Sequence, residues 1–315
     1  MLTFLLRRLA TFAATLAIAS VVIFAALELL PGDPAQVMLG IDAPPEVVTA
    51  LQKKLGVDRP VVERYFSWIA GLAVGDMGES FTYVMPINEL IMSRLAVTLP
   101  LALFAAVLSI VIGVPIGLYA AAHHKTPRDY GVMVFGQLGI AIPNFWFAIL
   151  LILVFSVYLG WFPAGGFPGW SAGFWPALKS LFLPALALAI VEAAIFARIS
   201  RSAVLDVLRE DFVRTARAKG LNRRATLIKH VLRNALIPIV TICGLEVSSL
   251  LVGTIVIEQV FNIPGLGRLV FQSLTQLDLM VVKNLIMLLV ALVVFINLVV
   301  DLLYAVIDPR LKQGH

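Results

Sequence analysis

Residues 181–200 read LFLPALALAIVEAAIFARIS, an almost unbroken apolar run in which only Glu192 and Arg198 are ionisable. A helix needs about 20 apolar residues to cross the hydrocarbon core of a bilayer. Comparable runs occur at residues 9–30, 95–122, 132–159, 235–260 and 284–307. The pattern therefore predicts an all-α integral membrane protein with six transmembrane helices. Pro143 and Pro238 lie inside two of the longer runs and predict a tilt or a kink there.

The composition agrees with a membrane protein. Of 315 residues, 60% are hydrophobic and 14% are charged, whereas soluble domains carry about 25% charged residues. The net charge is +5, but the basic residues stand in short blocks between apolar runs, which is typical of membrane topology and not of nucleic-acid binding. The single cysteine, Cys243, has no partner for an intramolecular disulfide or a thiolate metal site.

The distribution of Lys and Arg predicts the orientation. With a cytoplasmic N-terminus, 16 of the 24 basic residues fall on the cytoplasmic side, as the positive-inside rule requires. Both termini are then cytoplasmic, including a tail at 308–315. Residues 1–30 loosely resemble a signal peptide around Ala17–Ala19, but the apolar run continues too far beyond that point. We therefore expect residues 1–30 to be an uncleaved anchor helix.

Residues 31–93 form a long polar segment, expected on the external side, with helical signals of its own. Pro45 and Glu46 predict the start of a short helix, and Gly56 is a plausible C-cap after it. A second apolar-periodic stretch, 61–72, carries Tyr65, Phe66 and Trp68. Two interpretations remain open for this stretch: a helix lying on the membrane face, or an ordinary capping subdomain.

The most informative loop is EDFVRTARAKGLNRRATLIKHVLRNALIP, residues 210–238. Acidic residues at 210 and 211 suit a helix N-terminus, and Phe212 and Ala216 lie one turn apart on a small apolar face. Gly220 predicts a helix stop, because glycine adopts the left-handed C-cap conformation without steric cost. Asn222 is a candidate cap for a second helix. The residues alone leave two roles open, a basic topology anchor or a docking site for another protein.

RTARAKGL followed by HVLRNALIP resembles the EAA loop of ABC-importer permeases, in the form found in the dipeptide/oligopeptide/nickel permease family. Further matches occur in the family's order: LLRRL, LLPGDPA, LGVDRPVVERYFSWI, GDMGES, RLAVTLPLAL, IVIEQVFNIPGLGRL and YAVIDPRL. They cover nearly the whole chain. The long segment after the first span makes the first-permease (B-type) subunit the nearer match.

This resemblance implies the type I ABC importer permease fold, with a core permease domain at 94–307 and a coupling loop at 201–234. The family's Glu-Ala-Ala triplet falls on Arg214, Thr215 and Ala216, so the role of its carboxylate does not transfer. The implied ATPase-coupling residues are Phe212, Arg214, Thr215, Ala216, Arg217, Ala218, Lys219, Gly220 and Leu221.

The implied partners are a homologous second permease subunit, two ABC ATPase subunits carrying ATP and Mg²⁺, and a periplasmic or lipid-anchored solute-binding protein. The implied location is the bacterial inner membrane, in contact with lipid. Dipeptides or short oligopeptides are the expected cargo, with nickel chelates, glutathione and other peptide-like conjugates as alternatives.

Several enzymatic motifs are missing from the sequence. It contains no Gly-Lys dipeptide and hence no phosphate-binding loop for ATP. Neither a Gly-x-Ser-x-Gly elbow nor a His-Glu-x-x-His pair occurs, and all four histidines fall in predicted cytoplasmic segments. We therefore expect a non-catalytic translocation subunit with no cofactor or metal of its own. The alternatives are an intramembrane enzyme and a self-sufficient channel or secondary carrier.

Carboxylates within the predicted spans are candidate transport residues, because a charge at that depth is costly and normally faces a bundle interior or a water-filled cavity. Glu192 and Glu246 lie near mid-span and are the candidates for the translocation path, although protonated or hydrogen-bonded structural carboxyls are an equal alternative. Glu258 belongs to the IVIEQVFNIPGLG stretch. With Pro264, Gly265 and Gly267, it is assigned a structural or gating role.

Overall fold

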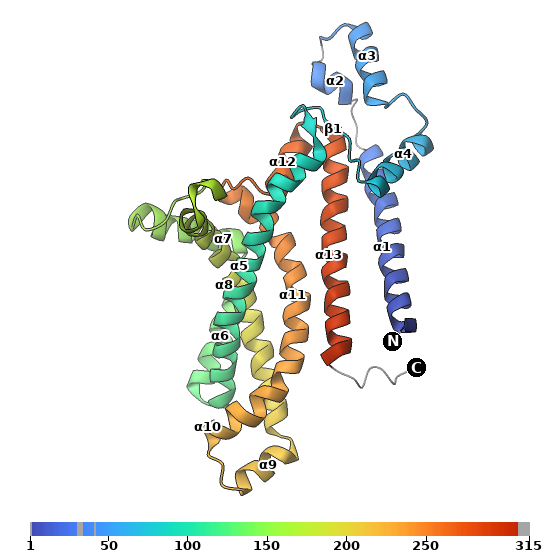
Figure 1. Ribbon diagram of the computed structural model, residues 1–315. Coiled ribbons are helices and arrows are strands. Elements are labelled where there is room, and N and C mark those ends of the chain that lie inside the picture. Colours follow the sequence, from blue (N-terminus) through green and yellow to red (C-terminus); the bar gives the residue numbers. More distant parts are fainter. Residues whose placement is uncertain (1, 30–33, 41, 308–315) are drawn as a thin grey trace. The chain divides into compact units, whose positions relative to one another are not determined.

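The computed structural model describes residues 2–29, 34–40 and 42–307. Among these residues the fold is helical except for one two-residue antiparallel pairing, β1 (Glu79–Ser80) with β2 (Met85–Pro86) (Figure 1). The chain divides into two compact units. Unit 1 comprises Met1–Val97 and Pro264–Phe295, and unit 2 comprises Thr98–Ile263 and Ile296–His315. The tail expected at 308–315 lies outside the described residues, as do residues 1 and 30 of the expected anchor helix and residues 31–33 and 41 of the external segment.

The helices follow the predicted runs but extend beyond several of them. Their bounds are α1 Leu2–Glu28, α2 Pro34–Leu39, α3 Pro45–Leu55, α4 Val61–Val74, α5 Ile87–Ala122, α6 Pro127–Ala141, α7 Asn144–Leu151, α8 Phe174–Leu208, α9 Asp211–Ala218, α10 Arg223–Thr226, α11 Leu232–Val260, α12 Leu266–Thr275 and α13 Leu279–Ile307. Two π-helical segments, η1 (Ile152–Tyr158) and η3 (Leu227–Val231), and a 3-10 turn, η2 (Trp170–Ala172), complete the described chain.

Four helices of the described chain are long and apolar enough to cross a membrane: Leu5–Glu28, Ile87–Ala122, Phe174–Leu208 and Leu279–Leu302. A fifth span arises if Pro127–Ala141 and Asn144–Tyr158 count as one, but these two segments are bent by 98°. Pro143 stands at this break with an extended backbone (ψ 140°), as a proline without an N–H favours. The kink predicted there is confirmed and is sharper than a tilt.

The remaining predicted span, 235–260, lies on α11, which continues through Pro238 without ending. Only Ser248–Val260 stands out within α11 as a shorter apolar helix. By length and composition, four to five helices of the described chain could therefore cross a membrane, and the count of six stays a prediction.

In unit 1, α4 packs against both α1 and α13. Tyr65 and Trp68 of α4 contact the ring of Phe24, with centroid distances of 5.4 Å and 6.1 Å. The indole N–H of Trp68 donates to Asn284 Oδ1 at 2.9 Å, and both groups are buried. Two of the three aromatics of the 61–72 stretch therefore pack within the protein, and only Phe66 is well exposed (63%).

The short helix predicted after Pro44 is α3, and it ends at Gly56 in the left-handed conformation (φ 67°), as the C-cap prediction requires. Further along unit 1, Asp278 ties the β hairpin to the start of α13. Its carboxylate accepts hydrogen bonds from Ser80 Oγ at 2.7 Å and from the backbone N–H of Val281 at 3.2 Å. An apolar cluster formed by α5, α12 and α13 lies beside this corner.

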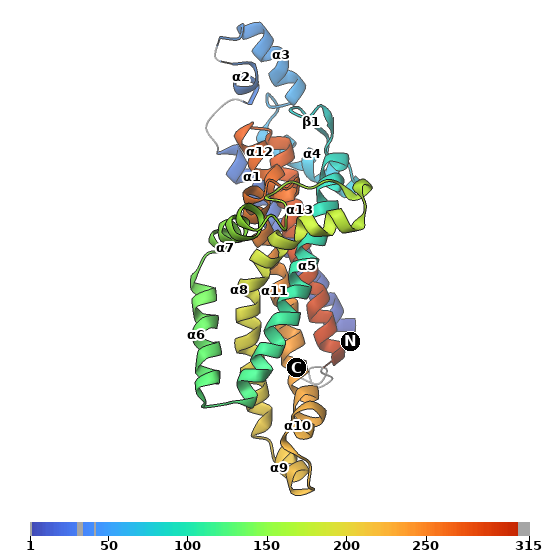
Figure 2. The same ribbon diagram turned by 90° about the vertical axis from the view of Figure 1, so that its left-hand side faces the viewer.

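In unit 2, α8 is the central helix. Its contacts with α6, α7 and α11 bury most of its length, and α6 and α11 can be followed beside it in Figure 2. Gly113 and Gly117 of α5 face α8 so closely that an added Cβ would lie 2.5 Å and 2.3 Å from the carbonyl oxygens of Ala193 and Ala197. Glycines four residues apart are a known means of bringing two membrane helices together.

Candidate functional site

The loop at 210–238 contains the predicted helix, glycine corner and second helix. Helix α9 follows Glu210, whose backbone is extended, and carries Asp211 in its first turn. Gly220 adopts a positive φ of +88°, and its N–H donates to the carbonyl of Arg217 at 3.0 Å. The helix stop predicted at Gly220 is therefore confirmed, since this φ is one that residues with a Cβ rarely adopt.

Asn222 caps the second helix as predicted. Its side-chain Oδ1 accepts the backbone N–H of Ala225 at 2.8 Å, and its carbonyl accepts the hydroxyl of Thr226 at 3.0 Å. A single turn, α10, follows and passes through the π-helical segment η3 into α11. Helices α9 and α10 lie at one end of the α8 and α11 pair within unit 2 (Figure 2).

The apolar face of α9 differs from the prediction. Val213 (1% exposed) and Ala216 (7%) are the buried residues, whereas Phe212 is 42% exposed. Val213 joins an apolar cluster with Val204 of α8, Val231 of η3 and other residues of α5, α8 and α11. The expected pairing of Phe212 with Ala216 on one face was wrong, because in an eight-residue helix the surrounding core selects which residues are buried. Val213 was overlooked, although its spacing of three from Ala216 carried the signal.

The outer surface of the loop is basic with one exposed aromatic ring. Phe212, Arg214, Thr215, Arg217, Ala218, Lys219 and Gly220 are exposed, Leu221 is half-buried, and Ala216 points inward. Arg214 lies 3.4 Å from Asp211 in an exposed ion pair, which contributes little at such a position. We define the α9 face as the seven exposed residues Phe212, Arg214, Thr215, Arg217, Ala218, Lys219 and Gly220.

A polar network that the sequence did not indicate joins α6 to α8 in unit 2. The buried carboxylate of Asp129 accepts from Arg201 Nε at 2.5 Å and Nη2 at 2.8 Å, in a bidentate pair. It also accepts the backbone N–H of Lys125 at 3.0 Å and contacts His124 Nδ1 at 3.2 Å. Because Asp129 and Arg201 are far apart in the sequence, no local pattern indicated this pair.

The two mid-span carboxylates meet at one hydroxyl. Ser249 Oγ on α11 lies 2.7 Å from Glu192 Oε1 on α8 and 3.4 Å from Glu246 Oε2. Glu192 is 9% exposed, and its other oxygen, Oε2, has no hydrogen-bond partner among the described residues. The structure therefore brings both predicted path residues together and leaves one buried acceptor available for a donor.

Glu258 occupies a different environment. It is fully buried, and its Oε1 accepts from the hydroxyl of Thr98 at 2.5 Å. Its carbonyl accepts the N–H of Ile263 at 2.8 Å, which closes the end of α11. Beyond this turn, Gly265 precedes α12 with an extended backbone, and Gly267 is buried within that helix. The structural or gating role expected of Glu258, Pro264, Gly265 and Gly267 stays a prediction.

Within the described ranges, no group of three or more His, Cys, Asp or Glu side chains is arranged to hold a metal ion. Two features of unit 2 are therefore candidates for function. One is the amphipathic helical corner at one end of the unit, and the other is the carboxyl pair inside its helix bundle. Such an arrangement defines a polytopic membrane protein with a protruding loop.

The chain belongs to the binding-protein-dependent transport system inner membrane component family, whose model matches residues 113–313. The N-terminal model for the same kind of membrane component matches residues 1–102. The dipeptide transport system permease protein DppB of Alkalihalophilus pseudofirmus is 37% identical over 332 residues, covering 99% of this chain and 100% of that protein. The glutathione transport system permease protein GsiC of Escherichia coli O6:H1 is 39% identical over 312 residues, covering 99% of both.

Solved structures agree with the fold. The inward-facing MetNI methionine ABC transporter matches with a TM-score of 0.59 at 20% identity, covering 70% of this chain and 96% of that chain. An amino acid ABC transporter solved with histidines matches with a TM-score of 0.51 at 18% identity, covering 71% and 94%. These likenesses concern the fold, while the family models and the permease relatives confirm the resemblance to the permease family stated from the sequence.

Proposed function

We propose that this chain is a permease subunit of an ATP-driven ABC importer that takes up dipeptides or short oligopeptides. The observation that carries the proposal is the match over 99% of the chain to permease proteins of dipeptide transport. A glutathione permease of similar identity supports a second candidate cargo, glutathione or a related peptide-like conjugate. The carboxyl pair inside unit 2 is compatible with either cargo, because both carry an amino group.

The chain would act without catalysis of its own. Paired ABC ATPase subunits would bind ATP and Mg²⁺, and a homologous second permease would complete the translocation path. A solute-binding protein, periplasmic or lipid-anchored, would deliver the cargo. The absence of a phosphate-binding loop from the sequence supports this division of labour.

We place the subunit in the bacterial inner membrane with six spans, both termini in the cytoplasm and residues 31–93 outside. The basic residues of the 210–238 loop support this orientation, since the loop joins two apolar helices and carries many of the chain's Lys and Arg residues. The α9 face is then cytoplasmic, where the ATPase subunits lie.

The α9 face would be the ATPase docking surface. Phe212 offers an exposed ring for a pocket on the partner, and aromatic residues and Arg are both enriched at protein interfaces. Val213 and Ala216 would hold the helix on the body of unit 2, so that a movement imposed on α9 is transmitted to α8 and α11.

The Glu192 and Glu246 carboxyls would bind the ammonium group of the cargo during its passage. An ammonium ion carries three donors, and the partnerless Oε2 of Glu192 is a buried acceptor for one of them. Two carboxyls within reach of one hydroxyl also disfavour the approach of an anionic side chain. This site would bias uptake toward neutral and cationic peptides.

The proposed function predicts ATP-dependent peptide uptake. Proteoliposomes containing this chain, its companion permease, both ATPases and the solute-binding protein should accumulate a radiolabelled dipeptide only when ATP and Mg²⁺ are supplied on the ATPase side. Uptake that is unaffected by omission of ATP would instead indicate a channel or secondary carrier. Competition by unlabelled glutathione would separate the two candidate cargoes.

Replacing Glu192 with Gln should change cargo selection. Gln keeps the shape and the hydrogen bond to Ser249 but removes the charge, and a hydrogen bond to a charged group contributes about 1.5–3 kcal/mol. We expect the ratio of cationic to acidic peptide uptake to fall roughly tenfold, since about 1.4 kcal/mol corresponds to a factor of ten.

Asp206→Asn is the matched control, because this exposed carboxyl lies on the same helix outside the pair. It should leave the ratio unchanged. If Glu192→Gln and Glu246→Gln both assemble and transport cationic, neutral and acidic peptides at wild-type ratios, the carboxyl pair has no part in selection.

A further inference from the structure

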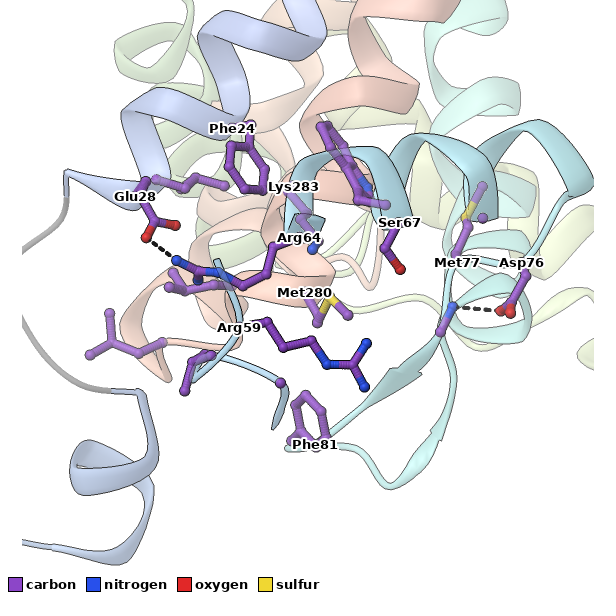
Figure 3. A pocket seen from close by; sticks show the side chains of 18 of the residues that line it. Phe24, Glu28, Arg59, Arg64, Ser67, Asp76, Met77, Phe81, Met280 and Lys283 are labelled. Atoms are coloured by element: carbon purple, nitrogen blue, oxygen red, sulfur yellow. Dashed lines mark hydrogen bonds and ion pairs between the residues drawn. The ribbon is translucent and has the colours of Figure 1, made fainter. Parts of the chain in front are cut away.

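Unit 1 contains a cavity of about 350 Å³ that the proposed transport mechanism does not use (Figure 3). Glu28, the last residue of α1, lines it, and so do Met280 and Lys283 in the first turns of α13. Both helices are candidate membrane spans, Leu5–Glu28 and Leu279–Leu302. The cavity therefore lies where two apolar spans meet polar chain, which is the depth of lipid headgroups.

One wall of this cavity is held in place by several contacts. Helix α4 is attached to α1 by the ion pair between Arg64 and Glu28 and by the hydroxyl contact between Tyr65 and Ser20 at 2.9 Å. On its other side, the buried indole of Trp68 donates to Asn284, whose side-chain N–H groups donate to the carbonyls of Met77 and Met280. The aromatic wall is thus fixed before any ligand binds.

The charges around the cavity are unbalanced in favour of cations. Four basic side chains line it, whereas only two lining side chains are acidic. The basic residues are Lys53, Arg59, Arg64 and Lys283, and the acidic ones are Glu28 and Asp76. Glu28 is engaged by Arg64, and Asp76 accepts the backbone N–H of Gly78 at 2.9 Å, as Figure 3 shows.

Arg64 is paired with Glu28, which leaves Lys53, Arg59 and Lys283 as the lining cations that a ligand could engage. Among the described residues, Arg59 forms an ion pair with Glu63 alone, an exposed and long contact of 3.8 Å. Lys283 Nζ lies 5.5 Å from the centroid of the Trp68 ring, and among the described residues no carboxylate is within ion-pair distance of it.

Apart from Ser67 and three glycines, the rest of the lining is apolar. Phe24, Leu27 and Met280 face the cavity from the ends of the two spans, and Val57 and Phe81 come from the polar segments. A small free anion would leave this apolar surface uncovered. An anion attached to a glycerol and acyl chains would cover it, and its chains could continue along the apolar surface of α1, most of which is exposed within the structure.

We propose that this cavity binds the phosphate of an anionic phospholipid headgroup, with Lys283 and Arg59 as its cationic partners and Trp68 as the wall beside them. Free inorganic phosphate would offer the cavity the same chemical group and is the alternative ligand. Guanidinium and ammonium groups at the membrane surface attract anionic lipids in this way. Bound lipid would join α1, α4 and α13 at their common end.

Trp68 provides a direct reporter for the test. In full-length chain whose other tryptophans, Trp146, Trp161, Trp170 and Trp175, are replaced by Phe, fluorescence comes from the cavity wall alone. These four residues are exposed and lie in unit 2. Detergent-purified protein is titrated with dibrominated phosphatidylglycerol and, in parallel, with dibrominated phosphatidylcholine, whose bromine atoms quench a nearby indole.

We expect half-maximal quenching at a lower mole fraction of phosphatidylglycerol than of phosphatidylcholine, by about fivefold for each cation involved. Lys283→Gln and Arg59→Gln should each reduce this preference, and together they should remove it. Lys179→Gln is the matched control, because Lys179 also lies over an aromatic ring, Phe162 at 5.9 Å, but in unit 2. Its preference should equal that of the parent.

Three results would overturn the proposal. Equal quenching by both lipids, or a preference that survives the double substitution, would show that Lys283 and Arg59 do not select an anionic headgroup. Displacement of phosphatidylglycerol by millimolar inorganic phosphate, with no preference left between the lipids, would assign the site to a free anion and reject the lipid. Size-exclusion profiles that match the parent confirm that each variant is folded.

Discussion

Gly117→Leu is expected to prevent stable folding of the subunit in the membrane. An added Cβ at this position would lie 2.3 Å from the carbonyl oxygen of Ala197 and 2.8 Å from Cβ of Ser200, so α5 and α8 would have to separate. Overpacking of this kind costs about 1–3 kcal/mol or more, which corresponds to roughly a 5–150-fold change in the ratio of folded to unfolded protein. The measurement is the monodisperse fraction of a fluorescent fusion after solubilisation of membranes.

Gly131→Leu provides a control of equal added volume. Gly131 lies in α6, and nothing is within 4 Å of the position of an added Cβ. Its monodisperse fraction should stay near the wild-type value. Gly113 meets α8 in the same way as Gly117, with Ala193 O at 2.5 Å, and Gly113→Leu should reproduce the loss. A stable Gly117→Leu protein would show that this helix crossing is not close in the membrane.

Gly220→Val is expected to uncouple transport from ATP hydrolysis while leaving insertion intact. The backbone at Gly220 has φ +88°, and an added Cβ would meet nothing within 4 Å. The cost is therefore conformational, about 1–3 kcal/mol, and it acts at the corner that sets the direction of the α9 face. We expect substrate-stimulated ATP hydrolysis and co-purification of the ATPase subunits to be lost.

Gly220→Asn is the control that separates backbone strain at positive φ from the mere addition of a side chain. Asn adopts positive φ more readily than a β-branched residue does, so this variant should keep most of the coupling. Because the corner is exposed, both variants should reach wild-type amounts in the membrane. Wild-type coupling in Gly220→Val would mean that the loop is a topology anchor and not a docking surface.

Several features of the chain could be predicted from the sequence because they depend on local physics. Long apolar helices follow from run length, since backbone N–H and C=O groups must bond internally within a bilayer. Gly220 and Asn222 were recognisable because a positive φ and an N-cap each favour a few residue types. The permease family was recognisable because many short motifs occur in one order along the chain.

Other features depend on contacts between residues far apart in the sequence, and only the tertiary structure decided them. Glu192 and Ser249 are 57 residues apart, and Asp129 and Arg201 are 72 apart. Neither pair belongs to a helical repeat, so periodicity carries no information about them. The cavity is a stronger case, because its lining combines the end of α1, the polar segment after it and the start of α13.

In helix α9, local sequence signals and tertiary packing each decided a different feature. Its sequence determined that a short helix forms and ends at Gly220, since start and stop signals act within a few residues. The core formed by α5, α8 and α11 decided which side of that helix is buried. Val213 packs into this core, and Phe212 stays exposed. In so short a helix several faces have similar apolar content, so the free energy gained by packing against the rest of the unit makes the choice.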